Sequence, residues 1–171
     1  MMEPQWDAIS GKMRYYGFDA RNDNVGVVFV PSYLTGNDGI FNMKYYDLLI
    51  GMDLTVFPSY YEPWGYTPLE SLAFGVPTVT TTLAGFGLWV KEYCKGEHPG
   101  IEVLERNDAN YDAVVGGVIA KVMEIAALDA DTMKKYRENA AEVSSIALWK
   151  NNIEYYEKAY SAALDKVVAR N

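Results

Sequence analysis

Within residues 53–87, the sequence patterns of a buried strand, a helix and a second strand follow one another closely. This order constrains the fold more than any other feature of the sequence. The run DLTVF at residues 53–57 is compact and apolar and ends at Pro58, which is typical of a strand buried on both faces of a parallel sheet. Helix signals follow at residues 67–70, and Val79 begins another strand. A strand, a helix and a strand with this spacing predict an α/β fold with helices flanking a parallel sheet.

A capping box marks the expected start of the helix. Thr67 is a good N-cap residue, Pro68 suits the first helical position, and Glu70 stands where it would bond back to the cap. Gly75 is placed to end the helix in the left-handed conformation. We therefore predict a short helix that starts at Pro68 and closes at Gly75.

The loop before this helix is a candidate anion site. Ligands of open α/β sheets lie beyond the carboxyl ends of the strands, where a helix N-terminus offers free N–H groups. Gly65, Tyr66 and Thr67 are the candidate phosphate donors, because glycine permits close approach and the proline that follows has no N–H. The sequence holds no Lys, Arg or His between Lys44 and Lys91. Cations that balance a bound diphosphate must therefore come from outside that stretch.

The motif YEPWGYTPLE at residues 61–70, followed by GVPTVTTTLAGFG at residues 75–87, resembles the donor site of glycogen synthases of the animal, fungal and Bacteroides-like type. Members of that family are retaining glycosyltransferases with two Rossmann-like domains, an arrangement called GT-B. The similarity extends over residues 25–164. Within it, Glu62 and Glu70 are separated by seven residues, which matches the Glu-x7-Glu pattern of retaining transferases.

The resemblance implies transfer of glucose from UDP-glucose to the 4-OH of an α-1,4-glucan with retention, and it implies no metal ion or other cofactor. Glu62 matches the residue that contacts the transferred glucose and supports the oxocarbenium ion, Glu70 the residue that holds the ribose, and Tyr45 the tyrosine that stacks on the uracil. On helical spacing alone, Tyr45 is equally a core residue. The implied substrate-binding residues are Tyr45, Trp64, Gly65, Tyr66, Thr67 and Glu70.

Each of these side chains also has a simpler interpretation. Glu62 has no capping role and is either a functional group or a solvated loop carboxylate. Glu70 either completes the capping box or binds a ribose, and these roles compete for one carboxylate. The aromatic side chains either pack within the loop or line a sugar or base pocket, because flat apolar faces with a polar tip suit such ligands. They are Tyr60, Tyr61, Trp64 and Tyr66.

Parts of the family pattern are absent from this sequence. The acceptor domain and the first βαβ unit, which supplies an Arg and a Lys for the diphosphate, have no counterpart in the first 25 residues. The resemblance therefore implies a carboxyl-terminal, donor-binding part of a two-domain enzyme that is inactive alone. Its partners are then a nucleotide sugar, an α-glucan, and either the missing amino-terminal part or a second copy of the chain to complete the sheet.

Two other functions stay open. A glycoside hydrolase would use Glu62 and Glu70 as a carboxylate pair about 5 to 10 Å apart in one cleft, although a capping role would turn Glu70 elsewhere. A non-catalytic module that binds nucleotide sugars or glucans would explain the missing cations.

Composition excludes several classes of function. The 171 residues, of which 50% are hydrophobic, suffice for one globular domain over residues 1–171, and the net charge of −8 argues against nucleic acids and anionic membrane surfaces. No run approaches the roughly 18 apolar residues of a membrane span, and no signal peptide is evident. Cys94 is the only cysteine, which suits a reducing cytoplasm.

Periodicity predicts the amino-terminal elements. We expect a helix over residues 4–16, a buried strand over residues 25–30, and a helix over residues 43–50 that Asn42 caps. The polar residues 35–39 suggest a turn rather than a cation site, because no further carboxylates have calcium-loop spacing. In a sheet that lacks two strands, we expect residues 25–30 either to pair directly with residues 53–57 or to pair with a second chain.

The rest of the chain alternates a helix and a strand and then becomes helical. A brief helix after Gly87 passes through Trp89 and Tyr93, and residues 101–104 form the last strand of a sheet of about four. Three helices with apolar stripes follow. The last, over residues 149–169, is a terminal helix that we expect to pack along a groove.

Overall fold

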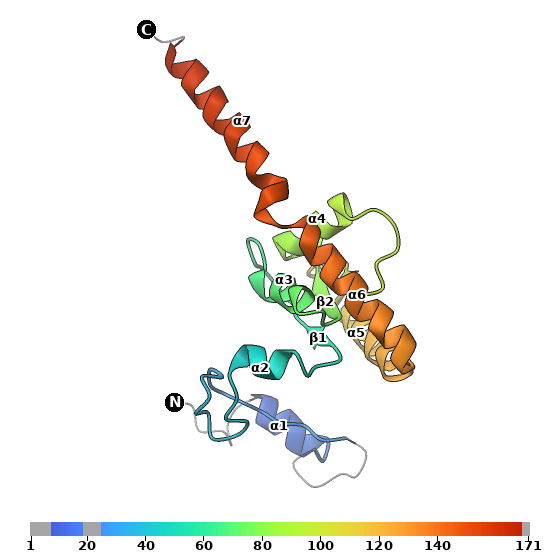
Figure 1. The fold of residues 1–171 in the computed structure, drawn as a ribbon. Coiled ribbons are helices and arrows are strands. Elements are labelled where there is room, and N and C mark those ends of the chain that lie inside the picture. Colours follow the sequence, from blue (N-terminus) through green and yellow to red (C-terminus); the bar gives the residue numbers. More distant parts are fainter. Residues whose placement is uncertain (1–7, 19–24, 169–171) are drawn as a thin grey trace. The chain divides into compact units, whose positions relative to one another are not determined.

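The computed structural model describes residues 8–18 and 25–168 (Figure 1). Contacts divide the chain into two compact units, Met1–Leu48 and Leu49–Asn171. The elements in chain order are α1 (Ala8–Tyr15), α2 (Tyr45–Leu49), β1 (Thr55–Val56), α3 (Tyr66–Ala73), β2 (Thr78–Thr81), α4 (Gly85–Tyr93), β3 (Ile101–Leu104), α5 (Tyr111–Ala126), α6 (Ala130–Ile146) and α7 (Trp149–Val168).

The first unit holds the predicted amino-terminal helix but not the predicted strand. α1 ends before Gly17, whose φ is 73°, and residues 4–7 of the predicted helix lie outside the described residues. Residues 25–30 form no strand, and Val27 and Val28 are exposed. A strand exists only where a second backbone pairs with it, and no described segment pairs with these residues. The prediction of a buried strand here is therefore wrong.

The polar loop of the first unit is a turn built around one carboxylate. Asp38 accepts the backbone N–H groups of Ile40, Phe41 and Asn42 at 2.7 to 2.9 Å. The side chain of Asn42 accepts the N–H of Gly39 instead of capping a helix, and α2 begins only at Tyr45. The side chain of Asn42 is therefore engaged within the turn, and the predicted cap at Asn42 is not formed.

Three parallel strands in the order β1-β2-β3 form the sheet of the second unit. Thr78 of β2 lies opposite both Thr55 of β1 and Ile101 of β3. We predicted about four strands, and the described residues contain three. Among the described residues, β1 pairs with β2 alone, so the predicted direct pairing of residues 25–30 with residues 53–57 is not formed. The two residues of β1 are half-buried rather than buried on both faces.

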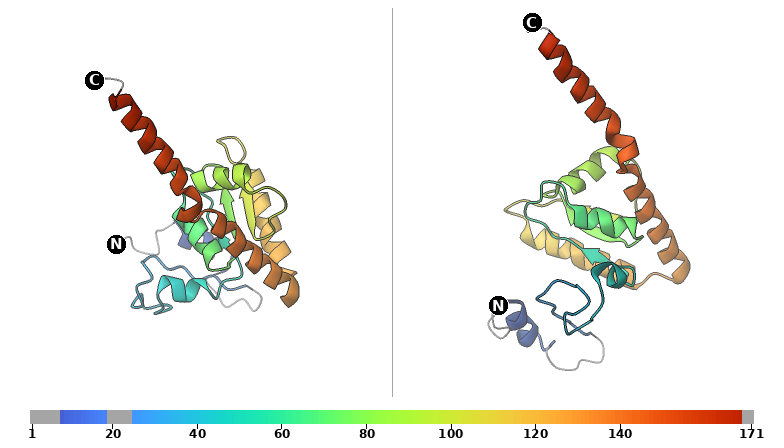
Figure 2. Two further views of the ribbon diagram at one scale, coloured as in Figure 1. Left: turned by 45° about the horizontal axis from the view of Figure 1, so that its top comes forward. Right: turned by 60° about the vertical axis from the view of Figure 1, so that its left-hand side comes forward.

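Helices cover both faces of this sheet (Figure 2). On one face, α3, α4 and α6 enclose the main core, in which Leu72, Phe86 and Val143 are fully buried. On the other face lies α5, where Lys121 pairs with Glu102 of β3 at 3.4 Å. The predicted α/β class with flanking helices is thus confirmed for the second unit.

The three predicted carboxyl-terminal helices are present as α5, α6 and α7, but the predicted packing of the last is not. Tyr156, Tyr160 and Leu164 on its apolar stripe are exposed, and no side chain of α7 among the described residues is buried. The expected groove is not formed by the described residues, because the stripe extends past the helices it could pack on. None of the described helices is both long and apolar enough to cross a bilayer.

Candidate functional site

The loop that follows β1 returns to the sheet at Glu62. The N–H of Glu62 donates to the carbonyl of Leu83 at 3.1 Å, and the N–H of Gly85 donates to the carbonyl of Glu62 at 3.0 Å. These bonds make a parallel bridge between Glu62 and Ala84, beyond the carboxyl ends of β1 and β2. Glu62 therefore lies at the edge of the sheet where ligands of such folds bind.

The carboxylate of Glu62 is held in place rather than freely solvated. It is half-buried, and the hydroxyl of Ser59 donates to its Oε2 atom at 3.2 Å. A Cβ atom on Gly65 would lie 3.5 Å from the same oxygen, so the carboxylate lies close to the residue that precedes α3. The structure thus brings Glu62 and Gly65 together and adds Ser59, which the sequence analysis did not single out.

The predicted capping box does not form. α3 begins at Tyr66, its N-cap is Gly65 with a φ of 111°, and no side chain caps it. The positive φ of glycine turns the chain into the helix two residues early. Pro68 then occupies the third helical position, where its missing N–H would have had no helical acceptor in any case. The carboxylate of Glu70 is therefore not engaged with Thr67.

The start of α3 presents the expected donors. Tyr66 and Thr67 are exposed residues of the first turn, and no hydrogen bond joins their N–H groups to another described residue. With Gly65, they offer a cluster of backbone N–H groups at the positive end of the helix dipole. This arrangement suits a phosphate or another anion.

The other end of α3 matches the sequence prediction. Gly75 has a φ of 70°, and its N–H donates to Leu72, while the N–H of Val76 donates to Ser71. These two bonds are the pattern of a Schellman motif. Thr78 and Ser71 bond to each other behind the helix at 3.0 Å. The short helix is therefore fixed at its carboxyl end, which in turn holds its amino end at the sheet edge.

The predicted aromatic residues do not form a single pocket. Trp64 is half-buried and packs edge-on against Phe86 and Trp89, at 5.7 and 6.0 Å between ring centroids. For its ring, the packing interpretation is correct. The other three aromatic residues of the loop are exposed: Tyr60, Tyr61 and Tyr66. Tyr45 belongs to the first unit, where it is half-buried in α2.

The glycines of the GFG segment allow close packing at the site. We placed the helix after Gly87, but α4 begins at Gly85. A Cβ atom on Gly85 would fall on the carbonyl of Pro63, and one on Gly87 would fall on the carbonyl of Thr81. The fully buried Phe86 between them donates its N–H to Trp64. The segment therefore joins the site loop to the end of β2.

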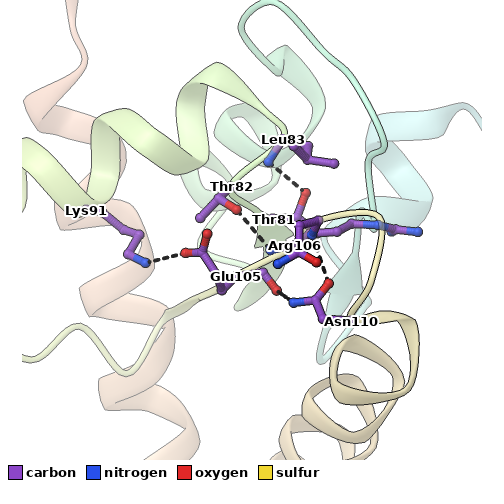
Figure 3. Close-up of polar contacts among 8 residues, drawn as sticks. Thr81, Thr82, Leu83, Lys91, Glu105, Arg106 and Asn110 are labelled. Atoms are coloured by element: carbon purple, nitrogen blue, oxygen red, sulfur yellow. Dashed lines mark hydrogen bonds and ion pairs between the residues drawn. The ribbon is translucent and has the colours of Figure 1, made fainter.

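Arg106 is a site residue that the sequence analysis missed (Figure 3). It is the second residue after β3 and is only 6% exposed. Its Nη1 atom donates to the carbonyl of Pro58 at 2.7 Å, and its guanidinium carbon lies 3.6 Å from the ring centroid of Tyr60. Its own N–H donates to Thr82, while nearby Lys91 pairs with Glu105 (Figure 3).

A signal for Arg106 was present in the sequence. The residues that directly follow parallel strands meet at one edge of the sheet. Arg106 is the first basic residue after the predicted strand 101–104. It also lies outside the stretch from Lys44 to Lys91, as the prediction about cations requires.

Comparison with known proteins gives consistent matches over the whole chain. The sequence model of the family described as glycogen synthase matches residues 1–171. Glycogen [starch] synthase isoform 2 of Saccharomyces cerevisiae is 32% identical over 168 residues, which cover 96% of this chain and 24% of the relative. The Neurospora crassa glycogen [starch] synthase is 33% identical over 148 residues, or 86% of this chain and 21% of the relative. The liver glycogen [starch] synthase of Mus musculus is 31% identical over 168 residues, or 97% and 24%.

The matched relatives are much longer than this chain. The chain spans about a quarter of the length of these curated relatives. The site described above lies inside the matched region of each.

Proposed function

This chain belongs to the glycogen synthase family, a family of glycosyltransferases, and we propose that it is the donor-binding part of a retaining enzyme of that family. The reaction would transfer glucose from UDP-glucose to the 4-OH of an α-1,4-glucan. One observation carries the proposal: the half-buried carboxylate of Glu62 lies beside Gly65, at the amino end of α3 and the carboxyl edge of the sheet.

In the proposed reaction, the amino end of α3 and the carboxylate of Glu62 have different roles. The N–H groups of Gly65, Tyr66 and Thr67 would hold the diphosphate, and the helix dipole would stabilise the charge that develops on the leaving group. Glu62 would face the transferred glucose and stabilise positive charge at its reacting carbon. The reaction as proposed needs no metal ion or other cofactor.

The remaining residues would bind the rest of the nucleotide. Glu70 is free of the capping role and would accept hydrogen bonds from the ribose hydroxyls. Tyr45 would stack on the uracil. The ring of Trp64 is packed against Phe86 and Trp89, so its contribution would be to fix the position of the loop.

A non-catalytic binding module is the second candidate, and the basic residues at this edge favour it. Arg106 is bonded to Pro58 and Lys91 is paired with Glu105, so neither is free for a diphosphate. This chain alone should then hold UDP weakly, because charge-assisted bonds supply much of such affinity.

We propose further that a parallel strand from outside these 171 residues completes the sheet at β1. β1 pairs only with β2 among the described residues, and exposed apolar side chains of α5 lie in the same unit. They are Val115, Ile119, Val122 and Met123. The amino-terminal part of a two-domain GT-B enzyme, or a second copy of this chain, would supply the strand.

We also propose a reducing, cytoplasmic location. Cys94 is the single cysteine and lies buried in the core, and burial raises the pKa of its thiol. A buried thiol of this kind is inert and is no partner for a disulfide.

Calorimetry and kinetics test the functional proposal. Titration of this chain with UDP, ADP and maltooligosaccharides should give dissociation constants for UDP weaker than about micromolar, and the chain should synthesise no glucan. In a longer, active polypeptide that contains residues 1–171, Glu62→Gln should lower kcat by about 100-fold or more, and Glu70→Gln should mainly raise the KM for UDP-glucose.

A matched control is Glu154→Gln, because Glu154 lies on α7 and its one ion pair within the described part of the chain is with Lys158. It should leave both constants unchanged. Turnover by the short chain would show that the missing parts are not needed. Full activity of the Glu62→Gln enzyme would exclude the proposed role of that carboxylate.

A further inference from the structure

Arg106 is a buried cation without a carboxylate partner. It is 6% exposed, and no described carboxylate forms an ion pair with it. An arginine stays charged at any ordinary pH, and burying its charge is costly unless the guanidinium is well bonded. Its partners here are the carbonyl of Pro58 and the face of the Tyr60 ring. Both side-chain contacts of Arg106 are therefore with one short stretch of the chain.

That stretch is the loop between β1 and Glu62. Arg106 contacts it at Pro58 and at Tyr60, and Thr81 contacts it in between, where its hydroxyl donates to the carbonyl of Ser59 at 2.9 Å. The hydroxyl of Ser59 in turn donates to the carboxylate of Glu62. The path of the loop, and with it the place of Glu62, thus depends on the last residue of β2 and on a residue that follows β3.

We propose that Arg106 is a positioning residue: by holding Pro58 and Tyr60 it fixes the loop that places the Glu62 carboxylate beside α3. Its use in catalysis rests on the function proposed above, whereas its hold on the loop does not. Arginine suits the task because one planar group stacks on a ring and donates along its edge at the same time. A lysine offers a charge but not both contacts in a fixed geometry.

The other end of β1 provides a matched control. Arg137 of α6 donates from Nη2 to the carbonyl of Met52 at 2.7 Å and pairs with Asp53 at 3.1 Å. Each arginine therefore bonds one backbone carbonyl near β1 at the same distance, and Arg137 also donates from Nη1 to the carbonyl of Gly75 at 3.4 Å. Only Arg106 contacts the loop that leads to Glu62.

Amide hydrogen exchange of the 171-residue chain tests the hold on the loop. In Arg106→Gln, the N–H groups of Glu62 and Gly85 should exchange at least about tenfold faster than in the wild type, while that of Thr78 in the centre of the sheet changes less than about twofold. Arg106→Lys should recover part of the protection. Arg137→Gln should leave Glu62 and Gly85 unchanged and speed the exchange of Thr55, whose N–H lies at the near end of β1.

Two kinds of result would overturn the inference: no effect on the loop, and an effect that is not specific to it. One is an unchanged rate at Glu62 in a folded Arg106→Gln chain. The other is an equal acceleration at Glu62 and Thr78, or the same acceleration at Glu62 in Arg137→Gln, because each would mean general loss of stability.

Kinetics of a longer, active polypeptide separate this inference from the proposed function. If both hold, Arg106→Gln should lower kcat about tenfold with a KM for UDP-glucose within about threefold of the wild type, and Arg106→Lys should restore most of kcat. If Glu62→Gln is fully active and the loop in Arg106→Gln exchanges faster, the proposed function is wrong, but the proposal that Arg106 positions the loop is supported. If Glu62→Gln loses activity while Arg106→Gln keeps both its kcat and its exchange rates at Glu62 and Gly85, the proposed function is supported and the positioning role of Arg106 is wrong.

Discussion

The carbonyl of Glu62 accepts the N–H of Gly85 at 3.0 Å, so the candidate catalytic residue is bonded directly to the first residue of α4. The same glycine leaves room for the carbonyl of Pro63, the residue after Glu62. The site loop and α4 therefore approach each other more closely than any residue with a side chain would allow.

Replacing Gly85 by alanine should move the two apart. We expect a loss of about 1 to 3 kcal/mol in the free energy of unfolding, because the new Cβ atom would fall on the carbonyl of Pro63. Urea unfolding measures the loss. Gly116→Ala in α5 is the matched control: nothing lies within 4 Å of its Cβ position, so the helix should gain about 0.5 to 1 kcal/mol. Equal effects of the two changes would contradict the close approach at Gly85.

The absence of a capping box gives a second prediction, which compares two helix starts. Glu70→Ala should change the free energy of unfolding by less than about 0.5 kcal/mol, since Glu70 caps nothing. Asp129→Ala should cost about 1 kcal/mol, because the Asp129 carboxylate accepts the N–H of Thr132 at 2.7 Å as the N-cap of α6. Thermal or urea unfolding of both variants measures the two losses in the free energy of unfolding. A loss at Glu70 as large as that at Asp129 would restore the capping interpretation.

A third prediction concerns the pH dependence of stability. The hydroxyl of Tyr136 donates to Glu124 at 2.7 Å, and this bond, opposed by partial burial and aided by Lys121, lowers the pKa of Glu124 below its ordinary value of 4.5. The bond to Glu124 likewise raises the pKa of Tyr136 above its ordinary 10.0. A lowered carboxyl pKa stabilises the fold above pH 4.5, and this contribution is lost as the pH falls through the folded value.

Tyr136→Phe should therefore cost about 0.5 to 1 kcal/mol at pH 7, a small effect because the carboxylate is largely solvated. The difference from the wild type should shrink as the pH drops below 4.5, the ordinary pKa of Glu124. On the alkaline side, the contribution of Tyr136 is present below pH 10.0 and lost above its raised pKa. Urea unfolding from pH 3 to 7, with the exposed Tyr160→Phe as control, measures it. A difference that stays constant over this range would contradict the assignment.

The parts of the fold that were predicted correctly carry local signals. The strand at residues 101–104, β3, has the predicted bounds because three of its four residues are apolar, two of them β-branched, and it lies between polar turns. Gly75 ends α3 as expected, since a left-handed residue at a helix end is nearly always glycine. The carboxyl-terminal helices have long apolar stripes that a strand cannot share.

The errors arose where a distant contact or a local backbone angle decides. Residues 25–30 have a strand composition, but a strand needs a partner, and none of the described residues provides one. The start of α3 was misplaced because the φ of Gly65, not the capping potential of Thr67, sets the first turn. Arg106 is 48 residues from Pro58 in the sequence, and only the meeting of strand ends at one edge connects them.

The two arginines beside β1 also bear on how the chain reaches this structure. The arginine that bonds the carbonyl of Pro58 comes 48 residues later in the sequence, and the one that bonds the carbonyl of Met52 comes 85 residues later, so these two contacts form only after the strand, α3 and β2 have been made. Contacts of such separation form slowly, because a long loop must close before they yield any energy. During synthesis, the loop that carries Glu62 can therefore take its final form only once Arg106 has been made, and both ends of β1 are held only once α6 has packed.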